Sequence, residues 1–295
     1  MKNHTQGLLS VHSAVLIFGL TALFSKLIAL SAVEITLLRS VFAVIAIGLY
    51  IKFLKQSLSL NSKKDVGIAI VLGILLGTHW VTFFHAMQVS SIAVGIIALY
   101  TYPVITVFLE PLFHGEKPDI KDIISALLVL FGIYLLVPEF SLDNASVQGV
   151  FWGVLSAFLF AIRNLVHGNY FSHYAARHAL FYQTMVVMLM LLPFAGGSIP
   201  DVSEQQWLSL IILGVFFTAL PHTLFAYSLL HLKAKTASLV ACMQVVYGTL
   251  FAALILSEWP EWTTVAGGMI VVGTAMYETV TSNKSQRAVE AKRVD

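Results

Sequence analysis

The sequence predicts an all-α membrane protein of ten transmembrane helices, arranged as two inverted five-helix repeats with both termini in the cytoplasm. Three observations predict this: the composition, the lengths of the apolar runs and the distribution of lysine and arginine. Of the 295 residues, 58% are hydrophobic and 11% are charged, against roughly 45–50% and about 25% in soluble domains. So little charge cannot cover the surface of a water-soluble fold of this length.

Apolar runs of about 20 residues, the length that spans a bilayer as a helix, recur along the whole chain. Their ranges are 8–28, 34–54, 66–88, 92–113, 120–137, 147–171, 179–195, 207–230, 236–256 and 262–280. The joints between them are short, so no soluble domain is inserted. The first run is expected to be an uncleaved helix rather than a signal peptide, because it exceeds the usual apolar length and carries Lys26.

The positive charges fall on one side of the predicted membrane. The chain has 17 lysines and arginines, of which Lys26, Arg39 and Arg163 lie inside spans. With both termini in the cytoplasm, all the others lie in the termini, in cytoplasmic joints or, for Lys52 and Lys121, at the cytoplasmic ends of spans. The charged residues of the outer joints are all acids. This bias follows the positive-inside rule and predicts both the orientation and an even number of spans.

The composition also limits cofactors and partners. Cys242 is the single cysteine, so neither an intrachain disulfide nor a cysteine-based zinc site can form. A net charge of +2 without a basic domain argues against nucleic acid as a partner. We therefore expect no metal and no cofactor. The expected partners are a small-molecule substrate and membrane lipid, with the chain functioning as a monomer.

A short pattern occurs once in each half of the chain. Glu116 and Pro118 recur as Glu258 and Pro260, and both are displaced by one interval close to half the chain, which we call the repeat interval. An odd number of spans per half, five, places the second half upside down relative to the first. The predicted domains are residues 1–140 and 141–281, followed by a cytoplasmic tail at 282–295. Inverted repeats are typical of secondary transporters, whose sites lie near the midplane between the halves.

Several short motifs resemble one family over nearly the whole chain. They are Phe18-Gly19, Phe24-Ser25-Lys26, Arg39-Ser40-Val41-Phe42-Ala43, Ser90-Ser91-Ile92-Ala93-Val94, Tyr102-Pro103-Val104, Gly115-Glu116, Ala234-Lys235-Thr236-Ala237-Ser238 and Ser257-Glu258. In this order and spacing they resemble the EamA-type members of the drug/metabolite transporter superfamily. One departure is Val245, where the second repeat of the family often has a proline.

The resemblance implies a secondary transporter of the inner membrane that is not an enzyme. The expected substrate is a small organic metabolite, such as an amino acid, nucleobase, nucleoside, vitamin or drug-like compound. It would move by alternating access, with export the commoner direction. The alternatives are an intramembrane enzyme and a channel. The sequence contains no recognisable hydrolase or zinc-protease pattern, and a single asymmetric chain does not offer the rings of like groups that a channel filter uses.

The candidate substrate site consists of polar and aromatic residues deep within spans, where each polar atom must be paired or reach water. They are His79, Trp80, Tyr100, Tyr102, Arg163, Asn164, His222 and Gln244. The alternative for each is an interhelical hydrogen bond that serves packing alone. Arg163 could meet a substrate carboxylate, Glu110 or a backbone carbonyl.

Other residues are expected to have conformational or structural roles. Pro103 and Pro221 interrupt helices and are candidate hinges, because proline removes a backbone donor. Glu116 and Glu258 are expected to hold loops and neighbouring helix ends. Lys26 and Arg39 could pair with Glu34 or extend toward the membrane surface. Histidines 167, 173 and 178 are expected to lack facing carboxylates. Paired glycines at 73 and 77, and at 149 and 153, predict close helix approach.

Overall fold

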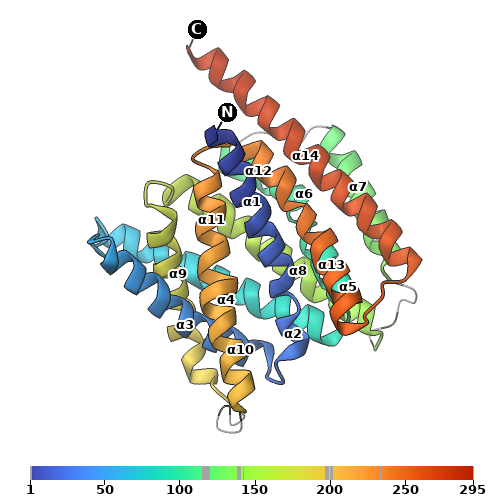
Figure 1. Ribbon diagram of the computed structural model, residues 1–295. Helices are drawn as coiled ribbons and strands as arrows, with labels where there is room; N and C mark the ends of the chain where they lie inside the picture. The colour runs from blue at the N-terminus through green and yellow to red at the C-terminus, as the bar shows by residue number, and fades with distance from the viewer. Residues whose placement is uncertain are drawn as a thin grey trace.

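The protein is a bundle of helices, described here from a computed structural model (Figure 1). The structure describes residues 2–114, 120–137, 141, 143–196, 199, 202–232 and 234–294, and these contain no strand. The first half comprises α1 (Lys2–Thr21), α2 (Phe24–Leu27), α3 (Ala32–Phe53), α4 (Lys63–Val89), α5 (Ile92–Leu99), α6 (Tyr102–His114) and α7 (Ile120–Leu135). The second comprises α8 (Ala145–Tyr170), α9 (Ala176–Leu191), η1 (Leu192–Phe194), α10 (Glu204–Gly214), η3 (Val215–Ala219), α11 (Leu220–Ser228), α12 (Ala234–Ala241), α13 (Met243–Leu256) and α14 (Trp262–Val294).

Eight helical stretches among the described residues are long and apolar enough to cross a membrane. They are His4–Leu27, Ala32–Phe53, Lys63–Val89, Ile92–Glu110, Ala145–Tyr170, Ala176–Phe194, Glu204–Ser228 and Thr236–Leu256. They correspond to eight of the ten expected spans. The other two correspond to α7, which has 16 residues, and to the first part of α14. The all-helical class is therefore confirmed, whereas crossings by α7 and α14 stay predictions.

Short polar side chains begin several of these helices. The Ser31 hydroxyl accepts a hydrogen bond from the Glu34 backbone N–H, and the Glu34 carboxylate accepts one in return from the Ser31 N–H. Ser62, Ser91 and Ser203 accept comparable hydrogen bonds at the starts of α4, α5 and α10. These caps satisfy N–H groups that a helix cannot pair internally. They fix where each apolar run begins.

Three of the spans are irregular near the middle. The stretch from Ile92 to Glu110 is broken at Tyr100 and Thr101, between α5 and α6, and the stretch from Thr236 to Leu256 is broken at Cys242. Tyr100 and Cys242 are separated by the repeat interval, as Glu116 and Glu258 are. The third irregularity is the π-helical turn η3 between α10 and α11. The two candidate hinge prolines, Pro103 and Pro221, are each the second residue of the helix that follows an irregularity.

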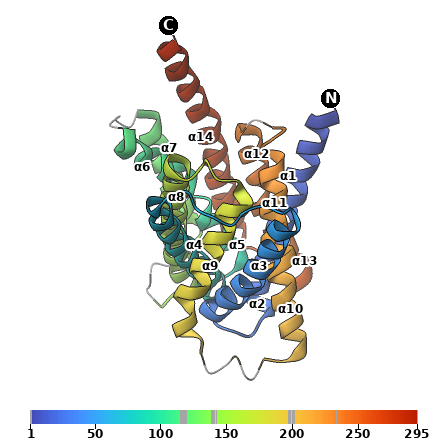
Figure 2. The same cartoon turned by 90° about the vertical axis from the view of Figure 1, so that its left-hand side faces the viewer.

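Contacts between the two halves come in pairs. Where a helix of the first half packs against a helix of the second, the equivalent helices also pack against each other with the halves exchanged. Helix α1 packs against α11 and α13, and α8 packs in the corresponding way against α4 and α6. Helix α4 also contacts α9, and α10 contacts α3, while α3 with α9 and α7 with α14 pair equivalent helices across the halves. Both described ends of the chain lie at the same end of the bundle (Figures 1 and 2).

Two glycine contacts show the same relation at the atomic level. An ideal Cβ on Gly7 would lie 2.8 Å from Cγ of Leu232, and one on Gly149 would collide with Oγ of Ser90. Gly149 follows Gly7, and Leu232 follows Ser90, by the repeat interval in both cases. The predicted close approach at the paired glycines is therefore present: a Cβ on Gly153 would lie 2.5 Å from Cβ of Ala98.

Candidate functional site

The polar residues expected near the midplane come together in the centre of the bundle. They are contributed by α3, α4, the α5–α6 break, α8, the η3–α11 segment and α13. Ring contacts and hydrogen bonds connect them into an imidazole group, a tyrosine group and two arginine groups. Each group is defined by its residues below.

The imidazole group is centred on His79. Nδ1 of His79 lies 2.7 Å from Oγ of Ser156 and 3.1 Å from the Ser156 carbonyl oxygen. The ring stacks on Phe160 with 4.7 Å between centroids, and Tyr102 meets the same phenyl ring edge-on at 5.0 Å. Phe160 therefore connects the imidazole to the start of α6, just beyond the helix break.

The tyrosine group joins the two helix breaks. The Tyr100 hydroxyl donates to the carbonyl oxygen of Ala241 and lies 3.2 Å from Oε1 of Gln244. Ala241 ends α12, and Tyr100 follows the last residue of α5. A broken helix leaves backbone carbonyls without their usual partners, and this hydroxyl supplies a donor. The side chain at one break thus satisfies the backbone at the other.

The first arginine group surrounds Arg39. Its guanidinium donates to Oγ1 of Thr218 from Nε and Nη2, at 3.2 and 3.0 Å, and lies 4.1 Å from the centroid of Trp80. His222 contacts the Trp80 ring at 6.3 Å between centroids and places Nδ1 2.7 Å from the Thr218 carbonyl oxygen. Arg39 is 3% exposed, so protein atoms surround it on every side.

The second arginine group surrounds Arg163. Oε1 of Gln183 accepts hydrogen bonds from Nε and Nη2 of Arg163 at 2.9 and 2.7 Å. Oδ1 of Asn164 accepts another from Nη1 at 3.0 Å. Phe160, Arg163 and Asn164 are spaced i, i+3, i+4 on α8, which places them on one helix face.

Exposure divides the eight predicted site residues in two. His79, Trp80 and Tyr100 are buried, at 5%, 5% and 3%. The remaining five are half-buried although they lie deep in the spans: Tyr102, Arg163, Asn164, His222 and Gln244. These five are the ones a ligand could reach. Two surface hollows, of about 470 and 270 Å³, lie between α3 and α9 and between α7 and α14, and none of the eight lines them.

Two expectations about arginines change. Arg39 does not pair with Glu34, whose Oε2 is bonded to Ser31; the π-helical turn instead presents Thr218 to it. Arg163 does not meet Glu110 or a carbonyl, because Gln183 and Asn164 occupy its guanidinium. Sequence reasoning missed Ser156, Phe160, Gln183 and Thr218. The spacing of Phe160 with Arg163 was the available signal for one of them.

Glu258 holds a helix end, as expected. Its Oε1 accepts from the backbone N–H of Ile92, the first residue of α5. Nζ of Lys26 donates nearby to the carbonyl oxygens of Gln88 and Ser90, at 3.3 and 2.8 Å. These contacts join the ends of α2, α4, α5 and α13 at the end of the bundle opposite the termini. Glu116 lies outside the described residues.

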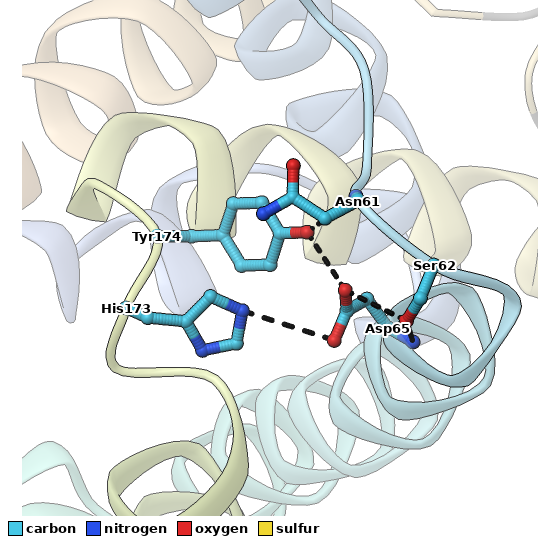
Figure 3. Close-up of polar contacts among 5 residues, drawn as sticks. All are labelled: Asn61, Ser62, Asp65, His173 and Tyr174. Carbon is cyan, nitrogen blue, oxygen red and sulfur yellow. Dashed lines mark hydrogen bonds and ion pairs between the residues drawn. The ribbon is translucent and has the colours of Figure 1, made fainter.

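The other end of the bundle carries a polar cluster around Asp65 (Figure 3). Its carboxylate accepts from the hydroxyls of Ser62 and Tyr174, both at 2.9 Å, and lies 3.8 Å from Nε2 of His173. The Tyr174 hydroxyl also accepts from the backbone N–H of Asn61 at 2.7 Å. His173 therefore does face a carboxylate, contrary to expectation. The cluster ties the α3–α4 joint to the α8–α9 joint.

The comparison with known families fits this arrangement. The EamA-like transporter family matches the chain twice, over residues 5–137 and again over residues 147–277. The chain belongs to the EamA-like transporter family. The resemblance to the drug/metabolite transporter superfamily is thereby confirmed, and the two matched segments cover the two halves whose contacts are exchanged.

Individual relatives of this EamA-like transporter are distant but span most of its length. The transporter YxxF of Bacillus subtilis is 23% identical over 300 residues, covering 100% of this chain and 96% of the relative. The inner membrane transporter YicL of Salmonella typhimurium is 23% identical over 303 residues, covering 98% and 100%. The pseudopaline exporter CntI of Pseudomonas aeruginosa PAO1 is 24% identical over 244 residues, covering 82% and 84%.

A solved crystal structure confirms the fold. It superposes with a TM-score of 0.62 at 16% identity, covering 92% of this chain and 98% of the other. Together, the family match, the apolar helices and the inner-membrane relative identify a multi-pass transporter of the inner membrane. Its environment is lipid and its substrate is a small molecule.

Proposed function

We propose that this EamA-like transporter moves a small organic metabolite, in the export direction, by alternating access of two inverted five-helix repeats around the central polar groups. The observation that supports this most is the position of the helix breaks. Tyr100 and Cys242 are one repeat interval apart, and the Tyr100 hydroxyl bonds across to the end of α12. Broken helices at matching places in the two halves, near the midplane, are typical of substrate sites in such transporters.

The exchanged packing supports the same proposal. The contacts of α1 with α11 and α13 are equivalent to the contacts of α8 with α4 and α6. If the two halves exchange these two sets of contacts, the transporter opens to the opposite side of the membrane. The proposed domains are residues 1–140 and 141–281, with ten spans and both termini cytoplasmic. Pro103 and Pro221 act as hinges in this scheme, and the functional unit is the monomer. The pseudopaline exporter among the relatives favours export.

Transport into or out of proteoliposomes tests the function. The purified full chain is reconstituted and loaded with an isotope-labelled mixture of amino acids, nucleobases, nucleosides and vitamins, and losses from the lumen are measured by mass spectrometry. A transporter gives saturable loss of a chemically unchanged subset. An altered mass would indicate an enzyme, and non-saturating loss would indicate a channel.

Site variants connect the activity to the central groups. We expect His79→Ala, Tyr102→Phe and Gln244→Ala to lower the rate of that loss, with the folded protein recovered at the wild-type level. Tyr170→Phe is the matched control, because Tyr170 is 48% exposed at the end of α8. If the three variants transport like the control, the central groups serve packing and the proposed substrate site is wrong.

Orientation is tested separately by cysteine labelling. Cys242 is buried and is the chain's single cysteine. In a Cys242→Ala background, the labelling of one introduced cysteine at a time can therefore be measured. Cysteines at Ser141 and Ser203 should react with an impermeant reagent from outside. A cysteine at Ser62 should react only after permeabilisation. The opposite pattern would overturn the proposed orientation.

A further inference from the structure

The two arginines in the centre of the bundle have no counter-ion among the described residues. Among the described residues, one acid–base contact lies within 4 Å, and it joins His173 to Asp65 at one end of the bundle. Among the described residues, no carboxylate forms a hydrogen bond or a salt bridge with the guanidinium of Arg39 or of Arg163. The ring of Trp80 contacts Arg39, and the neighbouring His79 stacks on Phe160, one helical turn from Arg163. Two positive charges therefore share one region of a membrane interior, and no described acid compensates them.

Such an arrangement is costly unless an anion enters it. A charged side chain deep in a bilayer is unfavourable, and intramembrane charges normally pair or mark a substrate path. Arg39 is stabilised in another way, since Trp80 and Phe84 lie 4.1 and 5.1 Å from its guanidinium carbon and Thr218 accepts two of its hydrogen bonds. Arg163 is bonded to neutral amides and is half-buried, so it is the arginine that a ligand can reach.

The amide beside Arg163 carries an unused donor. Gln183 is 0% exposed, and its Oε1 must be the atom facing Arg163, because a guanidinium only donates. Its Nε2 then has no hydrogen-bond acceptor in the described structure. A buried donor left unpaired costs free energy. An acceptor brought by a ligand beside Arg163 would satisfy it.

We propose that Arg163 and Gln183 bind the carboxylate of the transported metabolite, so that the substrate class is a small organic carboxylate. This rests on the transport function proposed above. A carboxylate matches the planar guanidinium fork and also accepts from an amide. One reachable guanidinium balances one negative charge, which favours a carboxylate over a phosphate ester with its charge of about −1.5 to −2.

The body of such a metabolite would lie on the aromatic side of the same site. Phe160 is one helical turn from Arg163 on the same face of α8, and it carries His79 and Tyr102 on its ring. An apolar or aromatic group about 5 Å from the carboxylate would therefore contact these rings. The polar end and the apolar end of the ligand are recognised by adjacent turns of one helix.

Matched acid and amide probes test the charge requirement. The purified full chain in detergent is titrated with 3-phenylpropionate, indole-3-acetate and hexanoate, with their uncharged amides and with phenethyl phosphate, and binding is read from the rise in unfolding temperature. We expect at least one acid to bind about tenfold or more tightly than its own amide and than the phosphate. Equal binding of acid and amide overturns the proposal, as does preference for the phosphate or binding by none of the acids.

A designed counter-ion tests the residues. Gln183→Glu offers Arg163 an internal carboxylate in place of the ligand's, so this variant should unfold at or above the wild-type temperature yet bind the acid about tenfold or more weakly. Arg163→Gln should lose the same binding. Arg177→Gln is the matched control, because Arg177 is half-buried, like Arg163, and bonds Gln56 at one end of the bundle. A Gln183→Glu variant that binds the acid normally overturns the assignment.

The transport assay separates this inference from the function on which it rests. If the wild-type protein moves only neutral or cationic members of the labelled mixture, the carboxylate assignment fails while the transport function stands. If it moves none of them although it is folded, the transport function itself fails.

Discussion

The carboxylate of Glu258, two residues after the end of α13, accepts a hydrogen bond of 2.5 Å from the backbone N–H of Ile92, the first residue of α5. A residue of the second half therefore caps a helix of the first half. A negative charge at this position also complements the positive end of the helix dipole. The contact fixes the start of α5, the short helix that ends at the break at Tyr100.

Removing this cap should destabilise the protein without changing the contacts among the polar groups in the centre of the bundle. We expect Glu258→Ala to lower the free energy of unfolding by about 1 kcal/mol, because the Ile92 N–H loses its acceptor. Glu258→Gln keeps an acceptor and should lose less. Chemical denaturation in detergent measures both. Glu261→Ala is the control at an exposed carboxylate nearby, and an equal effect there would mean that the cap contributes nothing specific.

The same carboxyl should make stability depend on pH. Burial raises the pKa of Glu258, although the Ile92 N–H and the Lys26 charge oppose the shift. A carboxyl with a raised pKa in the folded state contributes stability below its unfolded pKa of about 4.3 and loses it as the pH rises through the folded value. Glu258→Gln cannot titrate, so its stability relative to wild type should improve as the pH rises through this range. A difference independent of pH would contradict the shift.

The Tyr100 hydroxyl should contribute to the contact between the helix breaks. Tyr100→Phe removes the donor to the Ala241 carbonyl and the contact with Gln244. We expect a loss of about 1–3 kcal/mol, because the carbonyl is left unpaired in the core. Denaturation monitored by circular dichroism measures it. Tyr50→Phe, at a side chain 44% exposed on α3, should leave stability within about 0.5 kcal/mol of wild type.

Two glycines of α4 should respond in opposite directions to alanine. A Cβ on Gly73 would collide with Cβ of Val186 on α9, whereas one on Gly67 meets nothing within 4 Å. Gly73→Ala should cost about 1–3 kcal/mol through overpacking. Gly67→Ala should gain about 0.5–1 kcal/mol from helix propensity. The unfolding temperatures of the two variants, measured in the same detergent, test this prediction. Destabilisation by both substitutions would show that the contact at Gly73 is not responsible.

The Asp65 cluster should hold the two joints together at the end of the bundle that contains the termini. Tyr174→Phe removes the donor to Asp65 and the acceptor for the Asn61 N–H. We expect about 1 kcal/mol of destabilisation and faster amide hydrogen exchange at residues 56–62. Tyr170→Phe is the control, one helical turn earlier in the chain. Unchanged exchange in that joint would show that the cluster does not restrain it.

The sequence predicted the helices well because their signals are local. Apolar length places the helices, and the prolines at 103 and 221 lie beside real irregularities. What it could not supply were contacts between residues far apart in the chain. Arg39 was expected to meet Glu34, close by in the sequence, or to extend toward the membrane surface, but its partner is Thr218, 179 residues on.

The centre of the site was predicted in part for the same reason. Deep polar residues are visible in a sequence because hydrocarbon penalises them, so His79, Tyr102, Arg163 and Gln244 could be named as candidates, and their role in a substrate site stays a prediction. Gln183 carries the same signal within the run 179–195, and it was overlooked. Asp65 lies in the first turn of α4 and His173 in the joint between α8 and α9, and nothing local indicates that these segments meet.

The π-helical turn at Val215–Ala219 bears on which changes of length the chain can accept. A hydrogen bond from the Thr218 hydroxyl reaches back to the carbonyl of Leu213 at 2.8 Å, across a turn that holds one residue more than an α-helix. Deleting a single residue there would restore a regular helix and keep the span intact. Because the turn already absorbs its extra residue, α11 with His222 would keep the face that it presents to Trp80, whereas a deletion within α10 would rotate the rest of that span by about 100°. A one-residue deletion is therefore tolerable at this turn and disruptive in the regular helix before it.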